Sequence, residues 1–339
     1  MTRHLSIIAA LILEINAPAV WPRANRAELN RVFEKGAACV ARDHDGRRFR
    51  DPYLKYAYPE ERLPSIAIPG SPAPETPTYR MIDADMMLAM IADAVAPPES
   101  LIGPTKVARE RLAAVVPLWL GRGLGNIRRG ARVDGVALDT FCIVGWLAHD
   151  KEMARVVRDA IDGDGWLPVG FYDGEEAFRR EADECWCLRT LAGFADDSAT
   201  AAVRARIIGQ FRSTAEADPG SLASFYRAFH LGLALGEDPS TDPALFDEIT
   251  LALTRWAAAH PEDSLLEWVN LGSATFLRGE SGRVLSRRAI RIVLERQAQD
   301  GCWRVPGMIP EDYGSTFLTL RALAALATEL ARSEPNPAP

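Results

Sequence analysis

The C-terminal part of the chain contains a helix–turn–helix unit that recurs, in weaker form, along most of the sequence. An apolar segment ends at Gln297, a Gly301-x-Trp303 turn follows, and a segment rich in Leu, Ala and Thr runs from Ser315 to Leu323. An internal repeat constrains the architecture strongly, because each unit can bury its apolar face only against its neighbours. The sequence therefore predicts a fold built from repeated helical hairpins.

Five further units can be aligned with this last one. The third unit contains Asp162-Gly-Asp-Gly-Trp166, and its segment Leu188-Arg-Thr-Leu-Ala matches Leu320-Arg-Ala-Leu-Ala of the last unit. The other four units lie at 35–94, 133–147, 224–236 and 267–278. Six helical hairpins would therefore cover nearly the whole chain.

The apolar pattern divides the predicted helices into an outer and an inner set. The outer set shows amphipathic 3.6-residue spacing, whereas the inner set is apolar on most sides and rich in small residues, as expected for helices packed on both faces. The outer helices are predicted at 27–42, 107–121, 151–162, 199–214, 243–260 and 285–299. The inner helices are predicted to start near 82, 138, 182, 221, 264 and 315. No alternating β-branched runs indicate a sheet, so the predicted fold is all-α.

The last turn also carries a family resemblance. Gln297-x-x-x-Gly301-x-Trp303 resembles the Q-W motif of squalene and terpene cyclases (the squalene-hopene cyclase type) and of the related prenyltransferase repeat. The resemblance implies an α6/α6 toroid, in which six inner helices surround a central cavity. It also implies that Trp166 and Trp303 anchor their turns and are therefore structural.

The length and composition agree with one large domain. The chain has 339 residues and is 48% hydrophobic, which is ample for a large core. We expect a single toroid domain over 1–332 and a disordered tail at 333–339. A proline-rich insertion at 51–78 enters the first inner helix, and it is predicted to act either as a lid over one mouth of the toroid or as a rigid surface arm.

The charge and the cysteine content restrict the partners and the compartment. A net charge of −7 with mixed signs argues against a nucleic-acid surface. No stretch approaches the roughly 20 apolar residues of a spanning helix, so peripheral contact is the one membrane association left open. Glu14 and Asn16 interrupt the apolar N-terminal segment, which makes a secretion signal a poor interpretation. The five cysteines are expected to be reduced and buried, and the predicted location is the cytoplasm.

Aspartates recur at the starts of the predicted inner helices. Asp85, Asp139 and Asp183 occupy equivalent positions in units one to three, and Asp83 lies beside the first of them. Capping and the helix dipole explain each one structurally. In a toroid, however, the inner N-termini converge on one rim, where repulsion and burial raise some pKa values while dipoles lower others. We therefore predict these four aspartates as catalytic residues.

The first of these segments resembles a catalytic motif. Asp83-Ala-Asp85-Met86-Met87 is similar to the Asp-x-Asp-Asp-Thr-Ala motif of class II terpene cyclases, with the two methionines in place of Asp and Thr. In that family the second aspartate protonates an alkene or an epoxide. The resemblance implies that Asp85 is the general acid and Asp83 its hydrogen-bonded partner. The aspartates of units two and three would tune the charge or act as terminal bases.

A cation-forming reaction also needs a dry pocket lined by aromatic faces. The candidate substrate-binding residues on the inner helices are Phe141, Trp186, Tyr226, Trp268, Tyr313 and Phe317. Ordinary core packing is the alternative role for each. The predicted function is therefore a class II-like, proton-initiated terpene or polyene cyclase whose partner is a hydrophobic, isoprenoid-type substrate. No cofactor is expected, and Mg²⁺ enters only if that substrate is a diphosphate.

Three alternatives remain open. A carbohydrate-active α6/α6 hydrolase or lyase would use paired carboxylates on sugars and aromatic rings for stacking. A non-catalytic scaffold would have its carboxylates neutralised by arginines. A prenyltransferase β-like protein would bind zinc through Asp183-x-Cys185 and a histidine of a later inner helix, but the nearest such candidate, His230, is out of line with that pair, so no metal site is predicted.

Overall fold

The computed structural model of the chain describes residues 24–51, 54, 79–128, 151–159, 161, 185, 188, 191, 197–236, 241–260, 264–305 and 315–333. Within these ranges the structure is helical and contains no strand, apart from an isolated β-bridge between His44 and Phe49. The prediction of an all-α chain is confirmed for this part. None of its helices is both long and apolar enough to cross a membrane.

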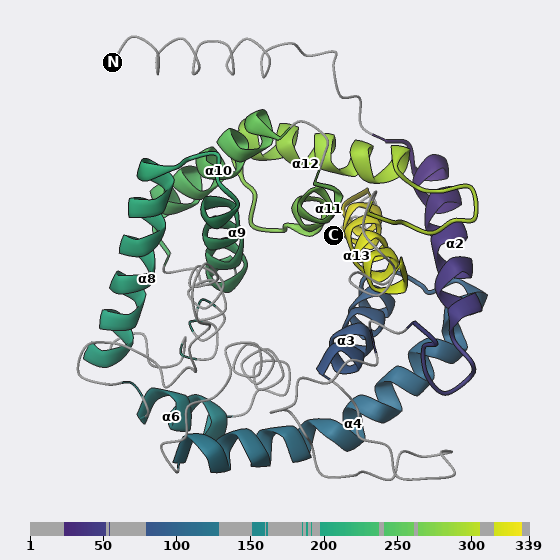
Figure 1. The fold of residues 1–339 in the computed structure, drawn as a ribbon, viewed down its shortest axis with the longest axis horizontal. Helices are drawn as coiled ribbons and strands as arrows, with labels where there is room; N and C mark the ends of the chain where they lie inside the picture. The colour runs from purple at the N-terminus through teal and green to yellow at the C-terminus, as the bar shows by residue number, and fades with distance from the viewer. Residues whose placement is uncertain are drawn as a thin grey trace, which may run out of the picture.

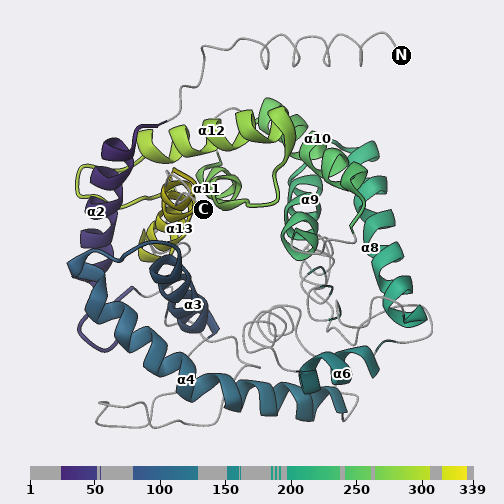
Figure 2. The ribbon, with the colours of Figure 1, turned by 180° about the vertical axis from the view of Figure 1, so that it is seen from behind.

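The described helices form an outer and an inner set (Figure 1). The outer helices are α2 (Arg26–Asp43), α4 (Glu99–Arg128), α6 (Lys151–Asp159), α8 (Ser198–Ala217), α10 (Pro243–Ala259) and α12 (Gly279–Glu295). The inner helices are α3 (Tyr79–Ala94), α9 (Leu222–Leu235), α11 (Leu265–Ser273) and α13 (Ser315–Ser333). Figure 2 shows the same alternation from behind, so the two sets occupy different layers in both views.

Local capping explains where several helices begin. Ser221, Asn25 and Asp242 precede helices and accept hydrogen bonds from backbone N–H groups of the following first turn. The predicted starts of the inner helices near 221, 264 and 315 agree with α9, α11 and α13. Helices α4 and α12 begin earlier than predicted. The first turn of α4 is followed by Gly103 and Pro104, two residues that disfavour a helix interior, and the first turn of α12 is polar and lacks the apolar spacing that was used to locate the helix.

Several predicted elements lie outside the described residues. The inner helices predicted near 138 and 182 do so except at isolated positions. The insertion at 51–78 does so except at residues 51 and 54, and the tail at 333–339 except at its first residue.

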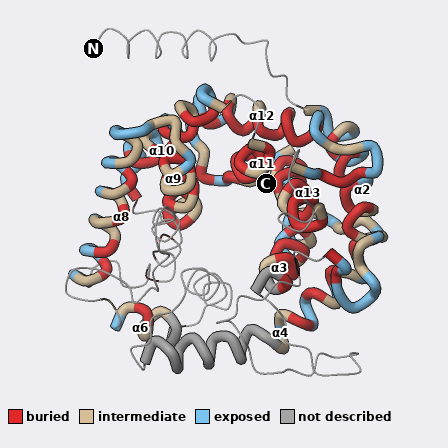
Figure 3. Tube along the Cα trace, viewed as in Figure 1, coloured by how far each residue is buried: buried red, intermediate tan, exposed pale blue. Residues whose placement is uncertain are grey.

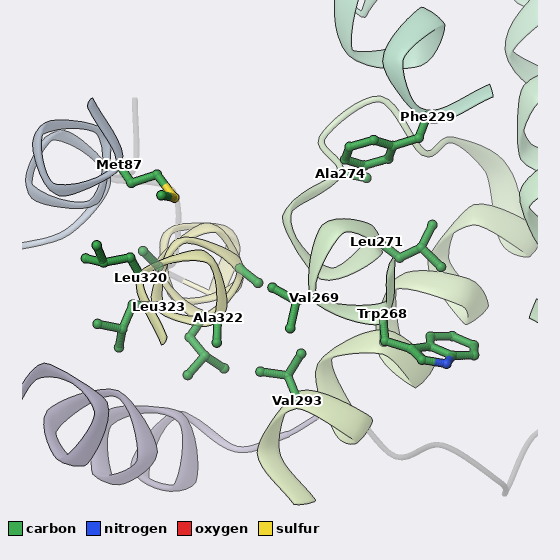
Figure 4. Packing of buried hydrophobic residues seen from close by; sticks show 14 of the residues in the cluster. Met87, Phe229, Trp268, Val269, Leu271, Ala274, Val293, Leu320, Ala322 and Leu323 are labelled. Carbon is green, nitrogen blue, oxygen red and sulfur yellow. The ribbon is translucent and has the colours of Figure 1, made fainter. Parts of the chain in front are cut away.

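The core lies between the two layers (Figure 3). Helix α13 packs against α2, α3 and α11, and α11 also packs against α12. Figure 4 shows Val269 and Val293 on the side of α13 that carries Ala322, whereas Leu323 lies on the side that faces Gly36 of α2. All four side chains are buried. A doubly packed inner helix therefore explains why α13 is apolar on most of its circumference.

The turn between α12 and α13 packs against α2. Gln297 donates one hydrogen bond to the carbonyl of Val32 (2.8 Å) and another to the carbonyl of Gly301 (3.0 Å). Trp303 is fully buried, and its indole N–H donates to the carbonyl of Val293 (2.7 Å). The prediction that Trp303 anchors the turn is confirmed. We call α2, residues 296–305 and α13 together the α2–α13 junction.

A disulfide bond crosses this junction. Cys39 of α2 and Cys302 of the turn are joined, with their Cα atoms 5.5 Å apart. The prediction that all five cysteines are reduced is therefore wrong for this pair. The spacing gives no sign of it, because 263 residues separate the two cysteines and only tertiary packing brings them together. Cys185 is buried and is not part of a disulfide bond, as predicted.

Candidate functional site

Asp85 lies buried between α3 and α4. Its Oδ2 atom is 3.4 Å from Nε of Arg111, and the two side chains are only 2% and 1% exposed. Arg111 also donates a hydrogen bond to the carbonyl of Arg47. Burial raises the pKa of Asp85 to about 7, although the charge of Arg111 opposes the shift. Asp85 therefore exchanges its proton near neutral pH, on the side of α3 that faces the outer helix.

Asp83 lies on a different side of α3. Residues two apart on a helix point about 200° apart around its axis, so their side chains do not face each other. Oδ2 of Asp83 is 3.6 Å from a guanidinium nitrogen of Arg321 on α13, and both side chains are partly exposed. The structure thus places Asp83 and Asp85 beside different arginines. The prediction that Asp83 is the hydrogen-bonded partner of Asp85 is therefore wrong.

Arg321 connects three of the inner helices. Besides Asp83 on α3, it donates a hydrogen bond to Oδ1 of Asn270 on α11 (3.0 Å). Its guanidinium carbon also lies 4.8 Å from the ring centroid of Phe317, one turn earlier on α13. An arginine over an aromatic face and between two oxygen acceptors is held in one orientation. The cation is therefore fixed between α3, α11 and α13.

Glu267 and Tyr226 extend this polar region to α9. The Tyr226 hydroxyl donates to Oε1 of Glu267 (2.8 Å). Glu267 is 7% exposed, and burial raises the pKa of its carboxyl group. The hydrogen bond from Tyr226 and the charges of His260 and Arg321 oppose that shift. Glu267 is thus a carboxyl group whose protonation is set by opposing environments, which is common at catalytic sites.

We call these six residues the inner cluster: Asp83, Tyr226, Glu267, Asn270, Phe317 and Arg321. They come from all four described inner helices. Three of them were predicted as site residues, whereas Glu267, Asn270 and Arg321 were not. Glu267 could have been found, because it stands in the first turn of an inner helix, where acidic residues recur in other units.

The remaining predicted residues fall elsewhere. Trp268 is fully buried, 5.6 Å from the ring of Trp256 and with the Arg288 guanidinium 4.8 Å from its own ring (Figure 4). Its surroundings are those of a core residue. The other predicted residues, Asp139, Asp183, Phe141, Trp186 and Tyr313, lie outside the described residues.

The described residues offer no group of three His, Cys, Asp or Glu side chains that could hold a metal ion. His230, the candidate zinc ligand on a later inner helix, packs edge-to-face against Tyr226, with ring centroids 5.9 Å apart. A complete zinc site is therefore not assembled within the part of the chain that the structure describes.

No protein-family model matches the chain, and the comparison with curated proteins finds no match. A function for this chain must therefore be inferred from the chemistry of the inner cluster and of the buried Asp85–Arg111 pair.

Proposed function

We propose that the chain is an α6/α6 toroid and acts as a proton-initiated cyclase, similar to class II terpene cyclases, on a hydrophobic isoprenoid or polyene substrate. The alternation of outer and inner helices in Figure 1 supports the toroid. The hairpins predicted at 133–147 and 162–191 would supply the inner helices that complete a set of six. The substrate would bind against the inner cluster, where four helices contribute side chains.

The observation that carries the proposal is the buried pair of Glu267 and Tyr226. A general acid in a dry site must hold its proton before the reaction and then tolerate the loss of it. Burial favours the protonated form of Glu267, while the Tyr226 hydroxyl and the Arg321 charge stabilise the carboxylate that remains. In the proposed reaction Glu267 transfers its proton to an alkene carbon, and the conjugate base keeps the hydrogen bond from Tyr226.

Asp85 has a different role in this proposal. Its carboxyl group is closed off by Arg111 and faces α4, so it does not lie on the inner side with the aromatic residues. Asp83 holds Arg321 in place, and Arg321 in turn stacks on Phe317. We therefore assign the role of general acid to Glu267 on α11, in place of Asp85 on α3.

The direct test is product formation. The purified protein is incubated with farnesyl diphosphate, geranylgeranyl diphosphate and squalene-type substrates, with and without Mg²⁺, and products are identified by gas chromatography–mass spectrometry. We expect a cyclised product that falls at least about 100-fold in Glu267→Gln, the usual effect of removing a general acid. Glu329→Gln on α13, also at a buried glutamate, is the matched control and should keep the activity.

Two results would contradict the proposal. Loss of product in Asp85→Asn, with full activity in Glu267→Gln, would show that Asp85 is the general acid, as the sequence had predicted. Absence of product from every substrate of this class, with a folded protein, would remove the cyclase function.

The polar half of the inner cluster favours a second candidate, a carbohydrate-active hydrolase or lyase. An isoprenoid chain cannot use the hydrogen-bonding groups of Asn270, Arg321 and Asp83, whereas a sugar that carries hydroxyl or carboxylate groups can. Incubation with neutral and uronic-acid oligosaccharides, analysed by mass spectrometry, tests this candidate. Cleavage that is lost in Arg321→Gln would support it, and intact oligosaccharides would exclude it for those substrates.

A further inference from the structure

The Cys39–Cys302 disulfide joins the first described helix to the turn before the last one. Both sulfur-bearing residues are buried, at 4% and 5% exposed. Between them the chain passes through α3, α4, α6, α8, α9, α10, α11 and α12. The bond therefore links the two ends of the helical array and encloses a loop of the chain that contains most of the domain.

The two cysteines meet within contacts that do not depend on the bond. Arg42 of α2 donates to the carbonyl of Asp300, and its guanidinium lies 3.8 Å from Sγ of Cys302. The hydroxyl of Thr319 on α13 lies 3.9 Å from Sγ of Cys39. It also accepts a hydrogen bond from the backbone N–H of Trp303 (3.1 Å). The α2–α13 junction can thus bring the two thiols together by packing alone.

A second set of contacts ties α2 to the start of α13. Asp43 Oδ2 accepts from the hydroxyl of Thr316 (2.8 Å), and Asp51 Oδ2 accepts from its backbone N–H (3.1 Å). On the outer side, Arg291 of α12 donates to Oε1 of Glu28 (3.1 Å). Noncovalent bonds therefore fix the relative position of the two ends on both sides of the disulfide.

We propose that Cys39 and Cys302 form a clasp that is closed by oxidation once the α2–α13 junction has docked, and that the protein works in an oxidising compartment. The reaction is thiol–disulfide exchange with a low-molecular-weight or protein disulfide. The two cysteine thiols lose two protons and two electrons to form the S–S bond. The oxidant's S–S bond is cleaved, and the oxidant leaves as two thiols.

This inference replaces the cytoplasmic location predicted from the sequence. Disulfides persist in oxidising compartments, whereas cytosolic thiols are generally kept reduced. The clasp also stiffens the contact on which the inner cluster depends, because α13 carries Arg321 and Phe317. It does not depend on the proposed catalytic function, and it is tested without substrate.

The first experiment maps the bond. The protein, purified without reductant and alkylated under denaturing conditions, is digested with trypsin and analysed by mass spectrometry. We expect peptides 36–42 and 297–304 as one linked species that separates after reduction. Recovery of the two peptides separately and alkylated, after equilibration with oxidised glutathione, would overturn the proposal.

The second experiment measures what the clasp does. A disulfide closing so long a loop typically raises the melting temperature of a domain of this size by about 5 °C. We expect reductant to lower the melting temperature of the wild type by that amount and to leave the double variant Cys39→Ser/Cys302→Ser unchanged. Cys185→Ser, at a buried cysteine outside the disulfide, is the control and should respond like the wild type.

Reduced and alkylated wild-type protein serves if the double variant does not fold. Hydrogen exchange should then be faster in α2 and in residues 297–304 than in α8 and α10, which lie away from the bond. Equal melting temperatures in the oxidised and reduced states, or uniform exchange across all helices, would show that the bond does not hold the junction and would overturn the clasp.

Discussion

The α2–α13 junction and the buried parts of α3 and α11 satisfy their polar groups differently. In the junction, the indole N–H of the buried Trp303 donates to Val293. Trp268 on α11 is equally buried, yet its indole N–H has no hydrogen-bond partner among the described residues. Asp85 Oδ2 likewise lacks a hydrogen bond there and has only the ion pair with Arg111.

This difference in hydrogen bonding distinguishes a region that serves stability from helices that carry reactive groups. The neutral polar side chains of Gln297 and Trp303 in the junction are hydrogen-bonded, which is what a contact selected for stability requires. Buried carboxyl groups with raised pKa values lie on α3 and α11, where they cost folding energy. The inner helices therefore hold the groups whose presence stability alone does not explain.

Trp303→Ala should lower the free energy of unfolding more than any other variant considered, because it removes a fully buried side chain that packs against Gly36 and Val293. We expect the free energy of unfolding to fall by about 3–5 kcal/mol. Urea denaturation followed by circular dichroism measures it. A loss below about 1 kcal/mol would mean that the junction is not the stable part of the molecule.

The buried carboxyl group of Asp85 should make stability depend on pH. The folded protein holds a proton between pH 4 and 7 that the unfolded chain releases, since the pKa rises from 3.8 to about 7 on folding. The free energy of unfolding should therefore fall as pH rises through this window, by on the order of 4 kcal/mol at most. Asp85→Asn should flatten the curve between pH 4.5 and 8, and an unchanged slope would exclude Asp85 as its source.

Alanine substitutions at two glycines separate the cost of steric crowding from the cost of backbone strain. Gly301 and Gly46 both have positive φ, at 88° and 94°. A Cβ at Gly301 would lie 2.3 Å from the carbonyl oxygen of Lys35, whereas a Cβ at Gly46 meets nothing within 4 Å. We expect Gly301→Ala to cost about 3 kcal/mol and Gly46→Ala about 1 kcal/mol, as measured by thermal melting. Equal costs would mean that α2 and the turn can move apart.

The smallest predicted effect is the difference in unfolding free energy between phenylalanine variants of the two tryptophans. Trp303→Phe leaves the carbonyl of Val293 without its indole donor, so it should cost about 1–2 kcal/mol beyond the lost ring volume. Trp268→Phe removes an N–H that has no partner in the described structure, so it should cost less. Paired urea denaturation curves of the two variants measure the difference. A larger loss in Trp268→Phe would reverse the comparison between the two regions.

The repeat pattern predicted the helical class, the division into outer and inner helices and the starts of α9, α11 and α13. These features depend on local spacing and capping, which a sequence displays directly. The Gln297-to-Trp303 turn was also predictable as a structural element, because its glycine and its tryptophan serve the turn itself. The starts of α4 and α12 were not predictable in the same way, since α4 begins ahead of Gly103 and Pro104 and the first turn of α12 is polar.

Only the tertiary structure decided which groups meet. It placed Asp83 and Asp85 beside different arginines, brought Glu267 to Tyr226, and joined Cys39 to Cys302. Each of these pairs links separate segments of the chain, and two of them, Asp83–Arg321 and Cys39–Cys302, join residues near its opposite ends. Partner choice of this kind depends on how whole helices pack and on the burial that results, and neither quantity is written in the local sequence of any one helix.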